Sequence, residues 1–221
     1  MNTISTPSRI WIVEDDIALA HSLQMLLDSA GLAETLHFEN ANACLTALPK
    51  AHHLVHAPGC LLLDIRLGAM SGIELFTKLK EFSWPWPVIF MTGHGDLEMA
   101  VDLVKQGAFD FVTKPFDPMS LINKVQQALQ VSGDKIQIAQ EQQLHLQRLL
   151  SLTKHEQQVL LSILSHKTNR EIAEEMSNST RTIETHRANI LKKMETVSAL
   201  ELAQLHERFL LRGGTLPFPT A

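Results

Sequence analysis

The residues best suited to chemistry stand where short apolar runs of the first half of the chain end. These runs are RIWIV, CLLL, VIFM and FDFV. The polar side chains that follow them are Glu14, Asp15, Asp16, Asp64, Thr92 and Lys114. Carboxylates brought together would repel one another, and a hard cation such as Mg²⁺ is their natural counter-ion. A hydroxyl and an ammonium beside them are donors suited to phosphoryl oxygens.

Each of these residues taken alone has a simpler interpretation. An acidic residue at a strand end is most often a solvated loop residue, and Lys114–Pro115 alone reads as a surface turn. The combination of four strand ends, each with a group suited to one phosphoryl site, favours the functional interpretation. It selects Glu14, Asp15, Asp64, Thr92 and Lys114, with Asp16 as a lesser candidate.

The elements that position these residues are predicted from apolar periodicity. Expected strands at 9–13, 33–38, 60–63, 88–91 and 109–112 alternate with expected helices at 17–27, 41–48, 72–79, 96–105 and 119–130. Strand–helix–strand units of this length form right-handed crossovers, and unbroken apolar strands indicate a parallel sheet covered on both faces. The prediction is a doubly wound, five-stranded α/β fold with its ligand site at the carboxyl ends of the strands.

The pattern changes after residue 131. Ser132–Gly133–Asp134 is expected to break the last helix, and residues 132–149 are expected to form a polar linker with helical character. Residues 150–211 are expected to form a small all-α domain, with helices at about 154–165, 169–176, 180–194 and 199–211. Capping signals precede these helices at Thr153, Thr168, Ser179 and Ser198. Residues 212–221 are expected to form a flexible tail.

Composition and charge support two domains with different partners. The 221 residues are 45% hydrophobic and 19% charged, which is typical of a globular protein. Residues 1–149 hold 10 basic and 16 acidic side chains, whereas residues 150–221 hold 9 and 8. No apolar segment is long enough to cross a membrane, and two cysteines cannot form a disulfide framework, so a cytoplasmic protein is expected.

Four motifs in the first half point to a known family. IVEDD, LLLDIR, MTGHGD and DFVTKPF, in this order and spacing, resemble the receiver domain of two-component response regulators over residues 8–131. The resemblance implies that Asp64 accepts a phosphoryl group from a sensor histidine kinase. It also implies a Mg²⁺ site formed by Glu14, Asp15, Asp64 and the Arg66 backbone carbonyl. It implies that Lys114, with a cis peptide bond to Pro115, pairs with the phosphoryl group, and that Thr92 and Phe111 move as the switch.

The second half resembles a DNA-binding domain. REIAEEMSNSTRTIETHRANILKKM, preceded by LTKHEQQVL, is similar to the LuxR-type helix-turn-helix domain, although His166 stands where glycine is common and Asn178 where a branched apolar residue is common. A receiver followed by this domain resembles the FixJ branch of the NarL/FixJ regulators. The TGHGD segment favours that branch.

The predicted second helix of the helix-turn-helix, residues 180–194, is suited to the DNA major groove. Its buried face is expected to contain Ile183, Ile190 and Leu191. Its first candidate DNA contacts, Arg181, Glu184 and Thr185, are expected to contact bases and phosphates. Thr182, His186 and Asn189 can also bond to a base or a phosphate, whereas Arg187, Lys192 and Lys193 are expected to contact phosphates.

The resemblance implies a transcription factor, usually an activator, that dimerises on phosphorylation and binds promoter DNA. RNA polymerase is a candidate further partner. Residues of the expected dimer face are Val101, Val104, Lys105 and Phe109, with one of the two valines expected in the core. Two alternatives stay open at this point: an aspartyl-phosphate hydrolase that uses Asp64 covalently, and an adaptor whose helical domain binds protein.

Overall fold

The computed structural model describes residues 7–48, 57–93 and 97–219. Its contacts divide the chain into two units, Met1–Gln137 and Ile138–Ala221. Each unit has its own hydrophobic core. Among the described helices, none is both long and apolar enough to cross a membrane.

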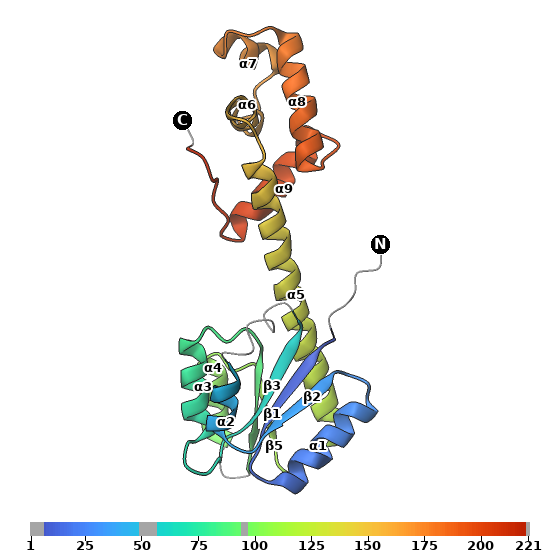
Figure 1. Ribbon diagram of the computed structural model, residues 1–221, viewed down its shortest axis with the longest axis vertical. Coiled ribbons are helices and arrows are strands. Elements are labelled where there is room, and N and C mark those ends of the chain that lie inside the picture. The colour runs from blue at the N-terminus through green and yellow to red at the C-terminus, as the bar shows by residue number, and fades with distance from the viewer. Residues whose placement is uncertain (1–6, 49–56, 94–96, 220–221) are drawn as a thin grey trace. The chain divides into compact units, whose positions relative to one another are not determined.

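The first unit is the predicted doubly wound α/β fold (Figure 1). Its strands are β1 Arg9–Val13, β2 Glu34–Phe38, β3 Gly59–Asp64, β4 Val88–Thr92 and β5 Asp110–Thr113. All are parallel, in the order β2-β1-β3-β4-β5. The helices that cover this sheet are α1 Ile17–Ser29, α2 Ala41–Ala47, α3 Gly72–Glu81, α4 Leu97–Lys105 and the start of α5 Pro118–Leu150. The start expected for α4, Asp96, lies outside the described residues.

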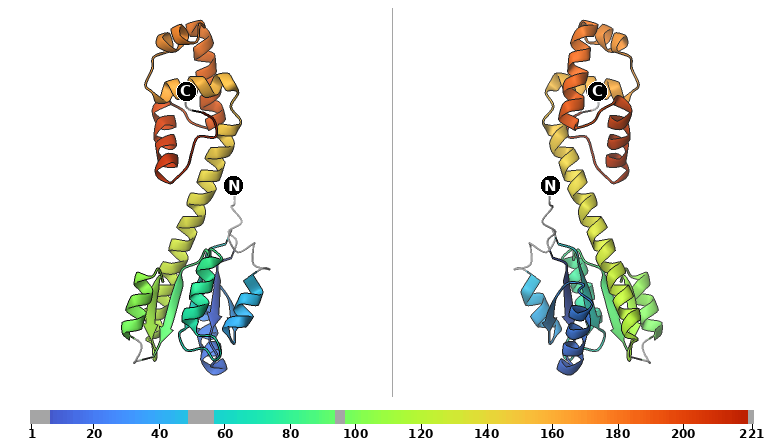
Figure 2. Two further views of the ribbon diagram at one scale, coloured as in Figure 1. Left: turned by 90° about the vertical axis from the view of Figure 1, so that its left-hand side faces the viewer. Right: turned by 90° about the vertical axis from the view of Figure 1, so that its right-hand side faces the viewer.

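Helices cover both faces of the sheet, as Figures 1 and 2 show, and an apolar core fills the space on each side. Helices α1 and α5 pack on one face, where Leu27 and Val125 are fully buried. Helices α2, α3 and α4 pack on the other face, where Cys44 and Leu75 are fully buried. Both faces of β3 are therefore covered, and all six of its residues are buried. This accounts for the unbroken apolar run in the sequence.

The expected break at Ser132–Gly133–Asp134 is wrong. Helix α5 runs without interruption through these residues for 33 residues, so residues 132–149 are helical, as expected, but continue the preceding helix. The Ser132 side chain is buried, and its hydroxyl accepts a hydrogen bond from the Gly59 backbone N–H at 3.0 Å. The Asp134 carboxylate accepts from the Gln130 side chain, one helical turn earlier, at 2.8 Å. These contacts outweigh the weak helix propensity of the three residues.

The second unit is all-helical, as predicted. The end of α5 is followed by α6 Lys154–Leu164, α7 Asn169–Glu175, α8 Thr180–Met194 and α9 Ala199–Leu211. Thr153 and Thr168 form complete capping boxes, and Ser179 caps α8. Ser198 caps α9, but the Glu201 carboxylate accepts from the Val197 backbone N–H instead of completing a box.

His166 and Asn178 differ from the residues common in the LuxR-type domain, and the structure shows how each is accommodated. His166 adopts φ of +59°, a left-handed conformation that favours glycine, which explains why glycine suits the position. Asn178 is exposed and donates from its side chain to the Met176 carbonyl at 3.1 Å, so it is not part of the core. The segment expected to be a flexible tail packs its Leu216 and Phe218 side chains against the core of the unit.

A buried histidine pair joins α5 to α9. His145 Nε2 lies 3.4 Å from His206 Nδ1, and the His145 ring packs on Phe209 with centroids 4.6 Å apart. Burial lowers the pKa of His145 to about 4, and the charges of His206 and Arg148 add to the shift. Burial also lowers the pKa of His206. Both rings are therefore neutral in the folded unit at neutral pH.

We expect acid to destabilise this unit selectively. Below the ordinary histidine pKa of 6.5, the unfolded chain binds protons that the folded pair does not bind. The free energy of unfolding should fall by about 2 kcal/mol from pH 7 to pH 4.5. Urea unfolding of the full chain, followed by circular dichroism, measures this change. Tryptophan fluorescence is the internal control, since Trp11, Trp84 and Trp86 all belong to the first unit. A His145→Leu chain that keeps the same pH dependence would contradict the assignment.

Candidate functional site

The sheet register brings the predicted side chains to one edge. Val13 of β1 is paired with Leu63 of β3, so the next residues, Glu14 and Asp64, are neighbours. Thr92 of β4 is paired with Thr113 of β5, which places Lys114 directly after that pair. The carboxyl ends of four strands therefore meet at one place, as predicted.

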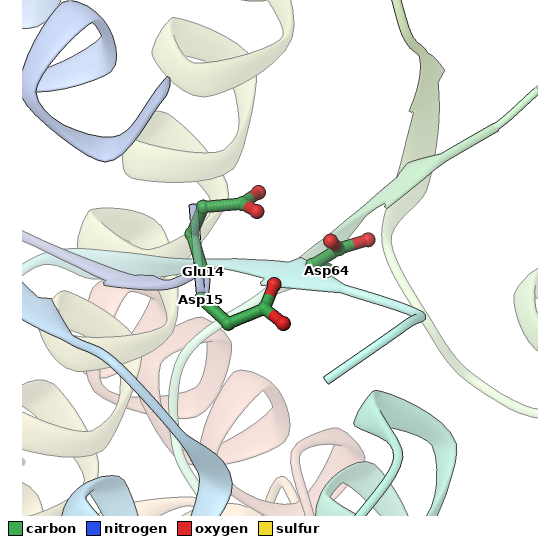
Figure 3. Close-up of side chains that lie close together, drawn as sticks. All are labelled: Glu14, Asp15 and Asp64. Carbon is green, nitrogen blue, oxygen red and sulfur yellow. The ribbon is translucent and has the colours of Figure 1, made fainter. Parts of the chain in front are cut away.

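Three carboxyl groups gather at this edge (Figure 3). Glu14, Asp15 and Asp64 each offer a carboxylate oxygen, and these oxygens all lie within 4.8 Å of one another. Glu14 and Asp64 are buried, whereas Asp15 is exposed. A cluster of this size and composition has the oxygen ligands that a hard divalent cation prefers.

Lys114 connects two of the carboxylates. Its ammonium donates to Glu14 at 2.7 Å and to Asp64 at 2.8 Å. Burial lowers the pKa of Lys114, but the hydrogen bonds to Asp64 and Glu14 outweigh that effect and raise the pKa above its ordinary value. The side chain is therefore a cation held in place by its partners. The Lys114–Pro115 peptide bond is cis, as predicted.

The balance of charge at the site remains negative. Three carboxylates face the Lys114 ammonium, and the strain on the charged form of Glu14 comes first from burial and then from Asp64. Burial raises the pKa of the Glu14 carboxyl; the hydrogen bond from Lys114 opposes this shift, and the charge of Asp64 adds to it. An added cation would relieve the repulsion between these carboxylates.

Asp16 has a structural role. Its carboxylate accepts from the backbone N–H groups of Ala18 at 2.9 Å and Leu19 at 3.1 Å, which makes it the N-cap of α1. It is not among the clustered carboxylates in the part of the chain that the structure describes. The sequence ranked Asp16 below Asp15 as a metal ligand but did not identify it as an N-cap, a role that aspartate also suits.

Two contributions to the site were missed from the sequence. His37 Nε2 lies 2.8 Å from the Glu14 backbone carbonyl, to which it donates. A Cβ at Gly72 would lie 1.9 Å from the Asp64 carbonyl oxygen, so only glycine fits there. The position of Gly72 directly after the capping residue Ser71 was a signal for a helix start, but not for this close approach.

The predicted switch residues lie beside this edge. The Thr92 side chain is buried, and its hydroxyl donates weakly to the Val112 carbonyl at 3.4 Å. Phe111 is half-buried against the core, with Lys124 Nζ 5.9 Å from its ring centroid. The Arg66 backbone N–H donates to Asp64 at 3.2 Å.

The residues of the expected dimer face are more exposed than predicted. Val101 is 42% exposed and Val104 is 37% exposed, so the expectation that one of them belongs to the core is wrong. Lys105 is exposed and pairs with Asp102 at 2.9 Å. Phe109 is partly buried against the core. This leaves an apolar surface on α4.

Helix α8 has the two faces that the sequence predicts. Ile183 and Ile190 are buried, and Leu191 packs partly against the same core. The candidate DNA contacts that are exposed are Arg181, Glu184, Thr185, Asn189 and Lys192, whereas Thr182, His186, Arg187 and Lys193 are half-buried. Thr182 lies 2.8 Å from the Ser179 hydroxyl in the cap, and Lys193 forms an ion pair with Glu156 at 2.6 Å. The structure thus gives these two residues internal partners.

Comparison with known proteins agrees with both units. The family model for the response regulator receiver domain matches residues 10–126, and the model for bacterial regulatory proteins of the luxR family matches residues 150–206. The chain is 38% identical over 205 residues to the transcriptional regulatory protein FixJ of Bradyrhizobium diazoefficiens, covering 93% of this chain and 97% of that protein. The chain belongs to the NarL/FixJ family of response regulators.

Other relatives support this assignment. The response regulator protein TodT of Pseudomonas putida is 37% identical over 201 residues, covering 91% of this chain and 86% of TodT. The solved structure of the response regulator StyR matches with a TM-score of 0.80 and 36% identity, covering 92% of this chain and all of that one. Full-length FixJ from B. japonicum matches with a TM-score of 0.57 and 36% identity, covering 92% and 97%.

The family assignment establishes the general function. This FixJ-like protein is a phosphorylation-dependent, DNA-binding transcriptional regulator of a two-component system. Its partners are accordingly a histidine kinase and promoter DNA. Of the three functions that the sequence left open, the assignment supports the transcription regulator. It gives no support to the hydrolase or to the protein-binding adaptor.

Proposed function

We propose that Asp64 is the phosphoacceptor of this regulator. The observation that carries the proposal is the Lys114 ammonium, which reaches the Asp64 carboxylate at 2.8 Å while Asp15 and Glu14 lie beside it. In the transfer, an Asp64 oxygen attacks the phosphorus atom of the kinase phosphohistidine. The new P–O bond forms as the P–N bond breaks, and the histidine leaves and takes up a proton. Lys114 stabilises the charge on the phosphoryl oxygens.

We also propose that the site takes Mg²⁺, held by Glu14, Asp15, Asp64 and the Arg66 backbone carbonyl. The excess of carboxylates over ammonium groups, and the raised pKa of Glu14 that burial and Asp64 produce, support this proposal. When bound, the cation neutralises charge on the phosphoryl group. His37 keeps the Glu14 backbone in place, and Lys114 orients the Asp64 carboxylate.

The proposed output couples this site to dimerisation and DNA. Thr92 would exchange its weak hydrogen bond to Val112 for one to the phosphoryl group, and Phe111 would move inward with it. That movement would reshape the neighbouring α4 face, with Val101, Val104, Lys105 and Phe109 as the dimer contacts. The dimer would act in the cytoplasm as an activator, with RNA polymerase as a candidate partner.

We propose that α8 reads DNA through its exposed side chains. Residues near the start of a recognition helix lie deepest in the major groove, which selects Arg181, Glu184 and Thr185 for base and phosphate contacts. Arg187 and Lys192 would contact phosphates, and Thr182, His186 and Asn189 would supply further polar contacts.

Replacing Asp64 with asparagine should abolish phosphorylation, because the amide is not a nucleophile and is a weaker metal ligand. The measurement is incubation with acetyl phosphate and Mg²⁺ followed by intact mass. Asp16→Asn is the matched control, since asparagine is an equally good N-cap. The control should gain one phosphoryl group. A stable phosphorylated species of Asp64→Asn would overturn the assignment.

Phosphorylation should create a dimer through the α4 face. Sedimentation velocity with beryllofluoride should show a dimer, and without it a monomer. Val101→Asp should abolish the dimer, because a charge would be buried in an apolar interface. The control is Met25→Asp on α1, where the side chain is also exposed. A dimer that survives Val101→Asp, or a chain that stays monomeric throughout, argues against this face.

Two exposed residues of α8 should affect DNA binding differently. The Glu184 carboxylate is suited to accept a hydrogen bond from a cytosine amino group. Glu184→Ala should therefore remove the discrimination at one base pair, a difference in binding free energy of roughly 1–3 kcal/mol. Lys192→Ala should weaken binding to all sequences and lower the salt slope by about one. Binding to single-base operator variants at several salt concentrations tests both. The opposite pattern would mean that the two roles are reversed.

A further inference from the structure

Lys193 and Lys192 are neighbours on the recognition helix but lie in different environments. The Lys193 ammonium donates to the Glu156 carboxylate at 2.6 Å and to the Ser151 backbone carbonyl at 3.1 Å. Lys192 is exposed and has no ion pair among the described residues. The two side chains are about 100° apart around the helix axis, so one faces α6 while the other faces solvent.

The partner of Lys193 is held firmly. Glu156 is 4% exposed, and its carboxylate also accepts from the Thr153 backbone N–H at 2.8 Å, which closes the capping box at the start of α6. Hydrogen bonds from Lys193 and from Thr153 outweigh the effect of burial and lower the pKa of Glu156. Without Lys193, this buried carboxylate would lose its only ion-pair partner among the described residues.

A second cation holds the same end of α8. Arg148, near the end of α5, donates to the Met194 backbone carbonyl at 3.4 Å and pairs with the Glu195 carboxylate. Met194 ends α8, and Glu195 caps it with φ of +53°. The last turn of the helix is thus anchored by Lys193 on one side and by Arg148 on the other. Both contacts lie within the second unit.

We propose that Lys193 is a positioning residue, which sets the orientation of α8 through Glu156 and does not contact DNA. Phosphate binding would require the ammonium to break both hydrogen bonds, one of them to a buried carboxylate. An exposed phosphate contact does not offset that loss. The inference rests on the proposed DNA contacts of α8. It replaces the sequence-based expectation that Lys193 binds phosphate.

The test compares adjacent lysines in the full chain with beryllofluoride. Kd for promoter DNA is measured at several salt concentrations for Lys192→Met and Lys193→Met. Lys192→Met should lower the salt slope by about one. Lys193→Met should weaken binding roughly 3- to 30-fold with the salt slope unchanged, because Lys193 itself contacts no phosphate.

A double-mutant cycle identifies the partner. Glu156→Gln should weaken binding as Lys193→Met does, and the double variant should lose no more than either single variant, because both break one pair. The double variant also leaves no buried charge unpaired, so it keeps the test valid if Lys193→Met fails to fold. Lys193→Arg, which keeps a cation, should restore binding.

The outcomes separate this inference from the function on which it rests. A salt slope lowered by Lys193→Met, or additive effects with Glu156→Gln, would make Lys193 a phosphate contact and overturn the inference. Unchanged affinity of the double variant would overturn it too. If Lys192→Met and Arg181→Ala also leave binding unchanged, then α8 is not the reading helix and the proposed DNA contacts fail as well.

Discussion

The proposed function depends on the excess of negative charge at the carboxyl edge of the sheet. Glu14, Asp15 and Asp64 bring three carboxylates together, and Lys114 is the cation that spans two of them. Such an arrangement is costly unless the charges are paired, since burial penalises each ion. Under the proposed function, a divalent cation or a phosphoryl group would alter this balance of charge directly.

The fold holds this edge by constraints that leave little freedom. Parallel register fixes which residues stand side by side, and Gly72 admits the Asp64 carbonyl because it has no side chain. Thr92 touches the edge from a buried position and bonds to β5. Under the proposed function, a change in charge at Asp64 would reach β5 through Thr92, as expected for a local charge event with a wider effect.

The helical unit uses paired charges for a different purpose. Lys193 and Arg148 hold the end of α8, while Arg181, Glu184 and Lys192 of the same helix are exposed. Of the basic residues of α8, Lys193 thus pairs with a buried acid, whereas Arg181 and Lys192 are exposed. Net charge alone does not reveal this division, since residues 150–221 hold nearly equal numbers of acidic and basic side chains.

The sequence by itself determined the two-part organisation, the α/β and all-helical classes, and the convergence of Glu14, Asp64, Thr92 and Lys114. The carboxyl ends of parallel strands meet at one edge of a sheet. The apolar periodicity and the order of strands and helices were therefore enough to predict this convergence. Helix caps were also predictable, because an N-cap contacts the chain only three residues away.

Tertiary structure decided what depends on distant contacts. Ser132 stays helical while its hydroxyl accepts a hydrogen bond from the Gly59 backbone N–H of β3, and Asp15 lies beside Asp64 because β1 and β3 are paired. His37, Gly72 and the pairing of Lys193 with Glu156 were not foreseen, because each acts on a residue far from it in the sequence or through the lack of a side chain. Local propensity is encoded in neighbours along the chain, whereas these roles are created only when separate elements pack together.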